Sequence, residues 1–273
     1  MRIERQPLGW RCHFRDRFGS RKERDMDEIY FEHAGARLYA TARGAGGAAS
    51  DAIIVLHGGL ATNEACWRFA APLAARSRVV APDLRASGRS HWSGELSWDL
   101  LADDIAALAR HLGITRATIG GVSFGAGCAV RVALRHPALA ARLVVLHPAY
   151  DGVALAPAQR AAMNAMRAAG ERALVDGIAA LFPLLETLPA PVRERARALV
   201  ATYDPASVAA LTRFMASGVQ PFAQPELAAI AVPVTVVPGA DPQHPAEVAA
   251  IYARYIARCT VVATDDFAAA IAG

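Results

Sequence analysis

The sequence has no long apolar run and few charged residues, and each shortage excludes a class of protein. No stretch of about 18 uninterrupted apolar residues occurs in its 273 residues, so we expect no transmembrane helix. Residues 1–25 contain no apolar segment of the roughly 7–15 residues that a secretory signal needs, so we expect a cytoplasmic protein. Hydrophobic residues make up 54% and charged residues only 20%, which excludes an intrinsically disordered chain and supplies one sizeable core.

Cysteine is also scarce, and its spacing excludes two further classes of protein. None of the four cysteines forms a C-x-x-C pair or has a second ligand at zinc spacing; they are Cys12, Cys66, Cys128 and Cys259. Without a secretory signal, free structural thiols are a better interpretation than two disulfides. We therefore expect no bound metal and no cofactor.

The small excess of positive charge is confined to one end of the chain. Residues 1–25 hold eight basic and four acidic residues, which accounts for the whole net charge of +4. We interpret residues 1–26 as a basic, disordered tail, with two alternatives: an arm that binds nucleic acid or anionic lipid, or an extension upstream of a natural start at Met26. The neutral body predicts neither a nucleic-acid nor a membrane partner.

Beyond residue 27, short apolar runs alternate with amphipathic segments. This alternation predicts an α/β fold, with a mostly parallel sheet and helices on both faces. The strands are predicted at 28–33, 37–41, 52–56, 78–81, 117–122, 142–146, 232–237 and 260–263, and the helices at 63–75, 97–112, 126–136, 245–256 and 266–271.

The alternation stops between residues 152 and 220. This segment is rich in Ala, Leu and Arg, is interrupted by prolines and has no convincing strand, so we expect a helical insertion between two parts of one core, 27–151 and 221–273. Its apolar residues would line a binding site or form the insertion's own core; the candidates are Met163, Met166, Leu181, Phe182, Phe214 and Met215.

The strongest chemical signal is the sequence GVSFG at 121–125, where a predicted strand meets a predicted helix. A G-x-S-x-G motif in this context is typical of a nucleophile elbow, a strained turn that exposes the serine hydroxyl. Both glycines are expected because a side chain two residues from Ser123 on either side would collide with a neighbouring strand or helix.

A second signal, His57-Gly58-Gly59, follows a buried strand. Acyl transfer needs backbone N–H groups directed at the developing oxyanion, and we expect them from Phe124 and Gly59. His57 follows the strand directly, so we interpret it as a residue that fixes this loop and not as a catalyst.

In these motifs the chain resembles the α/β-hydrolase fold superfamily over about residues 27–273. The resemblance rests on HGG at 57–59, PDLRASGRS at 82–90, GVSFG at 121–125 and VPVTVVPGADPQHP at 232–245. It implies that the helical insertion is a lid and that the turn after residue 82 is scaffold, through Asp83, Arg85, Gly88 and Ser90. A serine nucleophile favours esters, lactones, thioesters or activated C–C bonds over the branches that use an aspartate.

The resemblance also implies a triad acid on the loop after the strand that follows the lid, where Asp241 stands. Asp151 is the alternative, because some members place the acid after the preceding strand.

The expected histidine after the last strand is missing, because the sequence from 259 to 273 contains none. His244, His147 and His91 remain as candidates for the general base. His244 is only three residues from Asp241, and two strand spacings of about 4.8 Å separate its loop from that of Ser123, so its reach looks strained. The choice stays open.

The leading hypothesis is an esterase-like or lactonase-like serine hydrolase acting on a small or medium apolar acyl substrate through Ser123. The alternative is a degenerate member of the fold that binds a small ligand without turnover. A lyase or cyclase that uses the same oxyanion hole is a third option. Substrate identity and oligomeric state are left open.

Overall fold

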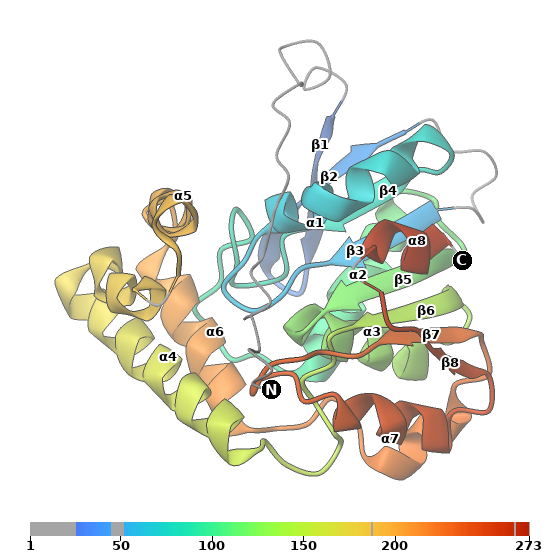
Figure 1. Cartoon of the computed structure of the whole chain (residues 1–273). Coiled ribbons are helices and arrows are strands. Elements are labelled where there is room, and N and C mark those ends of the chain that lie inside the picture. Colours follow the sequence, from blue (N-terminus) through green and yellow to red (C-terminus); the bar gives the residue numbers. More distant parts are fainter. Residues whose placement is uncertain (1–25, 45–51, 187, 265, 273) are drawn as a thin grey trace, which may run out of the picture.

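The computed structural model describes residues 26–44, 52–186, 188–264 and 266–272, so the predicted basic tail and Cys12 lie outside the described residues. One eight-stranded sheet has the order β1-β2-β4-β3-β5-β6-β7-β8 (Figure 1). The β1–β2 and β2–β4 pairs are antiparallel and the other pairs are parallel, which confirms the predicted fold class. The strands are β1 Asp27–His33, β2 Ala36–Arg43, β3 Ala52–Leu56, β4 Val79–Pro82, β5 Ala117–Val122, β6 Ala140–Leu146, β7 Val234–Val237 and β8 Cys259–Val261.

Helices cover both faces of the sheet, because the central strands are apolar on both sides. All five residues of β3 are buried, and their side chains alternate between two separate apolar clusters. The larger cluster includes α2 (Trp98–His111), α3 (Phe124–Arg135) and α7 (Glu247–Tyr255). The smaller one includes α1 (Asn63–Ala70) and α8 (Phe267–Ala272), on the opposite face (Figure 1).

The predicted helix at 63–75 differs from the structure in one respect. It is α-helical as α1 and then tightens into a 3₁₀ helix, η2 (Ala71–Ala75). Pro72 lacks an N–H group, so it cannot continue the hydrogen-bond ladder of α1.

The segment between β6 and β7 is helical, and among its described residues there is no strand. It contains α4 (Pro157–Asp176), η3 (Ile178–Leu185), α5 (Ala190–Val200) and α6 (Pro205–Ser217), followed by η4 (Gln224–Ala229). The Tyr203 hydroxyl donates to the carbonyl of Leu60 after β3 over 2.9 Å, and Trp92 N after β4 donates to Ser207 Oγ over 2.9 Å. The insertion therefore lies against the loops at the carboxyl ends of the strands.

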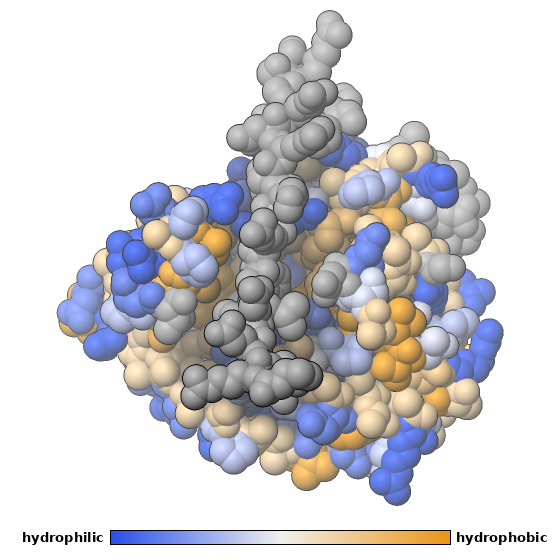
Figure 2. All heavy atoms as spheres, viewed as in Figure 1, coloured by the Kyte–Doolittle hydropathy of each residue, from blue (hydrophilic) through white to orange (hydrophobic). Residues whose placement is uncertain are grey.

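Figure 2 shows hydrophilic side chains over the outer end of this insertion and apolar ones on the side that faces the core. Among the described residues, no helix has the length and apolar character needed to cross a membrane. Cys66 and Cys128 are buried free thiols, and burial raises the pKa of both.

Candidate active site

Ser123 occupies a strained turn between β5 and α3. Its backbone has φ +56° and ψ −113°, a left-handed region that residues other than glycine rarely adopt. Gly121 and Gly125 make the turn sterically feasible. A methyl group on Gly121 would lie 2.1 Å from the Gly125 carbonyl oxygen, and one on Gly125 would lie 2.4 Å from the carbonyl oxygen of His57. The reason predicted for both glycines is therefore confirmed.

A chain of hydrogen bonds joins Ser123, His244 and Asp241. His244 Nε2 lies 2.8 Å from Ser123 Oγ, and His244 Nδ1 lies 2.9 Å from Asp241 Oδ2. Because the carboxylate can only accept, this network assigns the proton to Nδ1, which leaves Nε2 to accept from the serine hydroxyl. Partial burial raises the pKa of Asp241, but hydrogen bonds from His244 and from Gln243 N outweigh it, so the pKa of the carboxyl is lowered overall.

A tight turn after β7 explains how one loop supplies both His244 and Asp241. Asp241 and His244 form an antiparallel bridge, His244 N donates to Asp241 O over 3.0 Å, and Gln243 N donates to Asp241 Oδ1 over 2.8 Å. Gly239 permits the turn, because a methyl group there would lie 2.3 Å from both Cβ and the carbonyl oxygen of His244. The expectation of a strained reach for His244 is therefore wrong. It considers only the distance between the ends of β5 and β7, whereas the turn directs the imidazole back across β6 to Ser123.

The other two candidate histidines have different neighbours. The His147 ring stands edge-on to Phe267 with centroids 5.0 Å apart, and its centroid lies 6.2 Å from that of His244. His91 is exposed and lies close enough to Asp204 of the insertion for their charges to interact. Ser123 Oγ lies 2.8 Å from His244 Nε2, so the geometry favours His244 among the three candidates.

Asp151, the alternative acid, caps its own turn. Its Oδ1 accepts from Val153 N over 2.8 Å and from Ala154 N over 2.9 Å. The structure thus brings Asp241, and not Asp151, to the imidazole that contacts Ser123.

His57 fixes the glycine loop, as its position after β3 indicates. It is buried; Nε2 accepts from Leu84 N over 3.0 Å, and Nδ1 lies 2.8 Å from Gly58 O. Because Nε2 accepts and Nδ1 faces a carbonyl oxygen, these partners place the proton on Nδ1, and burial, which lowers the pKa of His57, favours this neutral form.

The glycine loop runs beside the elbow. A methyl group on Gly58 would lie 3.6 Å from Ser123 Cβ, and one on Gly59 would lie 3.8 Å from Phe124 Cβ. Phe124 is the first residue of α3, so its N–H has no acceptor within that helix. Met215 of α6 covers the loop, since the same methyl group on Gly59 would lie only 2.5 Å from Met215 Cε.

The turn after β4 is held by buried polar contacts of its own. Asp83 Oδ1 accepts from Asn63 N over 2.7 Å, and Ser90 Oγ donates to Asp83 O over 2.8 Å. Arg85 is buried and donates to both carboxylate oxygens of Asp104. Gly88 has φ +49°, and a methyl group there would lie 2.2 Å from Asp83 Oδ2. These contacts are those of a scaffold.

The apolar candidates in the insertion fall into two groups. Phe214 and Met215 face the elbow: the Phe214 ring centroid lies 5.3 Å from that of Trp98, which in turn lies 4.9 Å from that of Phe124. Met163 and Met166 also belong to or pack against this larger cluster. Leu181 and Phe182 instead pack in a separate cluster within the insertion.

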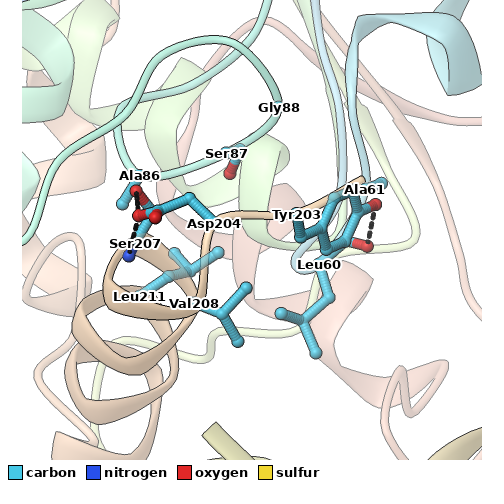
Figure 3. Close-up of a pocket in the computed structure, with 10 residues that line it drawn as sticks. All are labelled: Leu60, Ala61, Ala86, Ser87, Gly88, Tyr203, Asp204, Ser207, Val208 and Leu211. Carbon is cyan, nitrogen blue, oxygen red and sulfur yellow. Dashed lines mark hydrogen bonds between the residues drawn. The ribbon is translucent and has the colours of Figure 1, made fainter. Parts of the chain in front are cut away.

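A cavity of about 10 Å³ lies between the loop after β3, the turn at 86–88 and the start of α6 (Figure 3). It has room for about one water molecule, and Ser123 does not line it, so it is not a substrate site. Within the described parts of the chain, no cluster of three or more His, Cys, Asp or Glu residues is arranged to hold a metal ion.

Comparisons with known proteins agree with the fold. Residues 51–223 match the family model described as "alpha/beta hydrolase fold". A 2-hydroxymuconate semialdehyde hydrolase of Pseudomonas sp. (strain CF600) is 36% identical over 88 residues, 31% of each chain. A proline iminopeptidase of Xanthomonas citri is 34% identical over 133 residues, 46% of this chain and 38% of that one. These matches thus span about a third of the length of the curated relatives.

Solved structures match over most of the chain and show the shared fold. An esterase from Thermogutta terrifontis superimposes with a TM-score of 0.71 at 24% identity, covering 87% of this chain and 89% of that one. An enol-lactonase from Burkholderia xenovorans LB400 gives a TM-score of 0.72 at 22% identity, covering 87% and 91%.

Proposed function

Because the chain belongs to the alpha/beta hydrolase fold family, we propose that it is a serine hydrolase of the esterase or lactonase type, which cleaves a small or medium apolar acyl substrate through Ser123. One observation carries the proposal: the 2.8 Å contact between Ser123 Oγ and His244 Nε2, with Asp241 on the other ring nitrogen. This arrangement matches the roles of nucleophile, general base and orienting acid.

In the proposed reaction, Ser123 Oγ attacks the substrate carbonyl carbon while its proton passes to His244 Nε2. Backbone N–H groups of Phe124 and Gly59 stabilise the oxyanion. His244 then gives the proton to the leaving oxygen, and an acyl-enzyme remains. A water molecule, deprotonated by His244, attacks the acyl carbon, and the proton returns to Ser123 Oγ as the acid is released.

The surroundings of Ser123 support an apolar acyl group. Trp98, Phe124 and Met215 are all buried close to the elbow and present no charge. The relatives named as esterase and enol-lactonase act, by their names, on ester and lactone bonds, and these are the bond types we propose for this chain.

We also propose that the helical insertion, residues 152–220, serves as a lid. Met215 lies over Gly59, and Tyr203 is hydrogen-bonded to Leu60, so movement of α6 would change access to the glycine loop.

Labelling with a fluorophosphonate tests this function against ligand binding without turnover. We expect rapid, stoichiometric modification of the wild type, located at Ser123 by peptide mass spectrometry, and none in Ser123→Ala. We also expect the wild type to hydrolyse a series of p-nitrophenyl esters, with Ser123→Ala at background. Absence of both reactions in a folded wild type would overturn the proposal and favour the degenerate alternative.

A further inference from the structure

Gln159 joins the helical insertion to the loop that carries Asp241 and His244. It is the third residue of α4 and is only 2% exposed. Its Nε2 donates to Ala149 O after β6 and to Gln243 O after β7, both over 2.6 Å. Its Oε1 accepts from Ala156 N over 2.7 Å.

The orientation of this amide is fixed by its partners. Both atoms near Nε2 are carbonyl oxygens, and the atom near Oε1 belongs to an N–H group, so the opposite orientation of the amide would lose all three hydrogen bonds. Removing the side chain would leave two buried or part-buried carbonyl groups without this donor.

The loop it holds has little burial of its own. Ala240, Asp241 and Pro242 are exposed, and the Asp241 side chain is 52% exposed. Internal contacts between Asp241 and His244 give the turn its shape but do not fix its place in the molecule. Two hydrogen bonds between described residues attach the turn to the rest of the molecule: Gln159 Nε2 to Gln243 O, and Ser123 Oγ to His244 Nε2.

We infer that Gln159 is a positioning residue, which sets the imidazole of His244 against Ser123 through the carbonyl of Gln243. This rests on the proposed function of the Ser123 site. Gln243 immediately precedes His244, so a displacement of its carbonyl moves the general base. The first turn of α4 and the general base are thus mechanically coupled: a shift of the insertion at Gln159 changes the geometry of proton transfer.

The test compares Gln159→Leu with a matched control, Gln224→Leu. Gln224 also uses its amide to hold a loop, donating to Asp151 O over 2.9 Å and accepting from the Tyr255 hydroxyl over 3.3 Å, and both of these partners lie outside the loop of His244. We expect Gln159→Leu to slow fluorophosphonate labelling of Ser123 about 10²-fold, the scale of a misplacement of about 1 Å. In the steady state, kcat should fall and KM stay near its wild-type value, and Gln224→Leu should change neither.

A second measurement does not need activity. In ¹⁵N-histidine-labelled protein, with His244 assigned by its absence in His244→Asn, we expect the Nε2 resonance of His244 to shift in Gln159→Leu and not in Gln224→Leu. If Gln159→Leu does not fold, Gln159→Glu keeps the acceptor for Ala156 N and removes the amide donors.

The inference would be overturned if a folded Gln159 variant had the labelling rate and the His244 resonances of the wild type. It would also be overturned if Gln224→Leu changed the labelling rate and the resonances as much as Gln159→Leu does. If fluorophosphonate does not modify the wild type, the proposed function is contradicted, and the resonance shifts of His244 still decide whether Gln159 positions it.

Discussion

Gly239 and His244 lie so close together that a methyl group on Gly239 would come within 2.3 Å of both Cβ and the carbonyl oxygen of His244. The second contact is with backbone, so a change of rotamer cannot relieve it. The turn that returns the imidazole to Ser123 therefore depends on glycine at position 239.

We expect Gly239→Ala to open this turn and move His244 away from Ser123, with a loss of labelling rate of at least about 10²-fold, because proton transfer needs hydrogen-bond reach. Gly120→Ala is the control, since a methyl group there would meet only ordinary contacts, the nearest at 3.7 Å from Ile271. An unchanged rate in Gly239→Ala would show that the turn does not control the base.

Substitution of His244 should lower kcat far more than substitution of its neighbour His147. Removing the base from a serine triad costs about 10⁴–10⁶ in kcat, so His244→Asn should fall in that range. His147→Asn should lose less than about tenfold, because Ser123 Oγ already has His244 Nε2 at 2.8 Å and the ring of His147 packs on Phe267. Steady-state hydrolysis of one ester by both variants checks this. The reverse order would make His147 the base.

Met215 limits the space above Gly59. Gly59→Ala places a methyl group 2.5 Å from Met215 Cε and should lower kcat by less than about 10²-fold, because the N–H donor is displaced and not lost. Met215→Ala in the same chain should restore much of the rate, because the atom in collision is gone. If the double variant is no faster than Gly59→Ala, the collision with Met215 does not cause the fall in kcat.

The lowered pKa of Asp241 predicts how the free energy of unfolding changes with pH. The folded state binds the proton less readily than the unfolded state, so the contribution is present above the ordinary Asp value of about 3.9 and is lost as the pH falls through the lower folded value. It should stay below about 1 kcal/mol, because the half-exposed carboxylate is screened by solvent. Urea unfolding at pH 6 and pH 3 should show Asp241→Asn less stable than wild type at pH 6, with the difference shrinking at pH 3. A constant difference would contradict this.

Helices α4 and α6 cross closely at Gly170 and Thr212. A methyl group on Gly170 would lie 2.2 Å from Thr212 Oγ1, so Gly170→Ala should cost about 1–3 kcal/mol by overpacking. Thr212→Ala removes the obstructing oxygen, and the double variant should recover part of that loss in thermal or urea unfolding. Additive losses would show that the two positions do not interact.

The sequence alone predicted the layered fold, because the residues that set it form local patterns: continuous apolar strands alternate with amphipathic helices. It also predicted the elbow at Ser123, since a turn that sharp needs glycine on both sides, and glycine is visible in any sequence. Two helix boundaries differ from the prediction, because they depend on which N–H groups find acceptors: α1 gives way to a 3₁₀ helix near Pro72, and α3 begins at Phe124, two residues before the predicted start.

The tertiary structure alone brought His244 to Ser123 and left Asp151 in its own turn. The expected order of the strands in the sheet gave the separation of two strand ends, but the direction of a side chain at the end of a loop depends on how that loop folds back. Local contacts between Asp241 and His244 give the turn its shape, but its place against Ser123 depends on contacts between residues far apart in sequence, such as Gln159 and Gln243, which no local pattern reveals. The geometry at the strand ends therefore depends on the assembled sheet, whereas the strands themselves can be predicted from the local pattern of apolar residues.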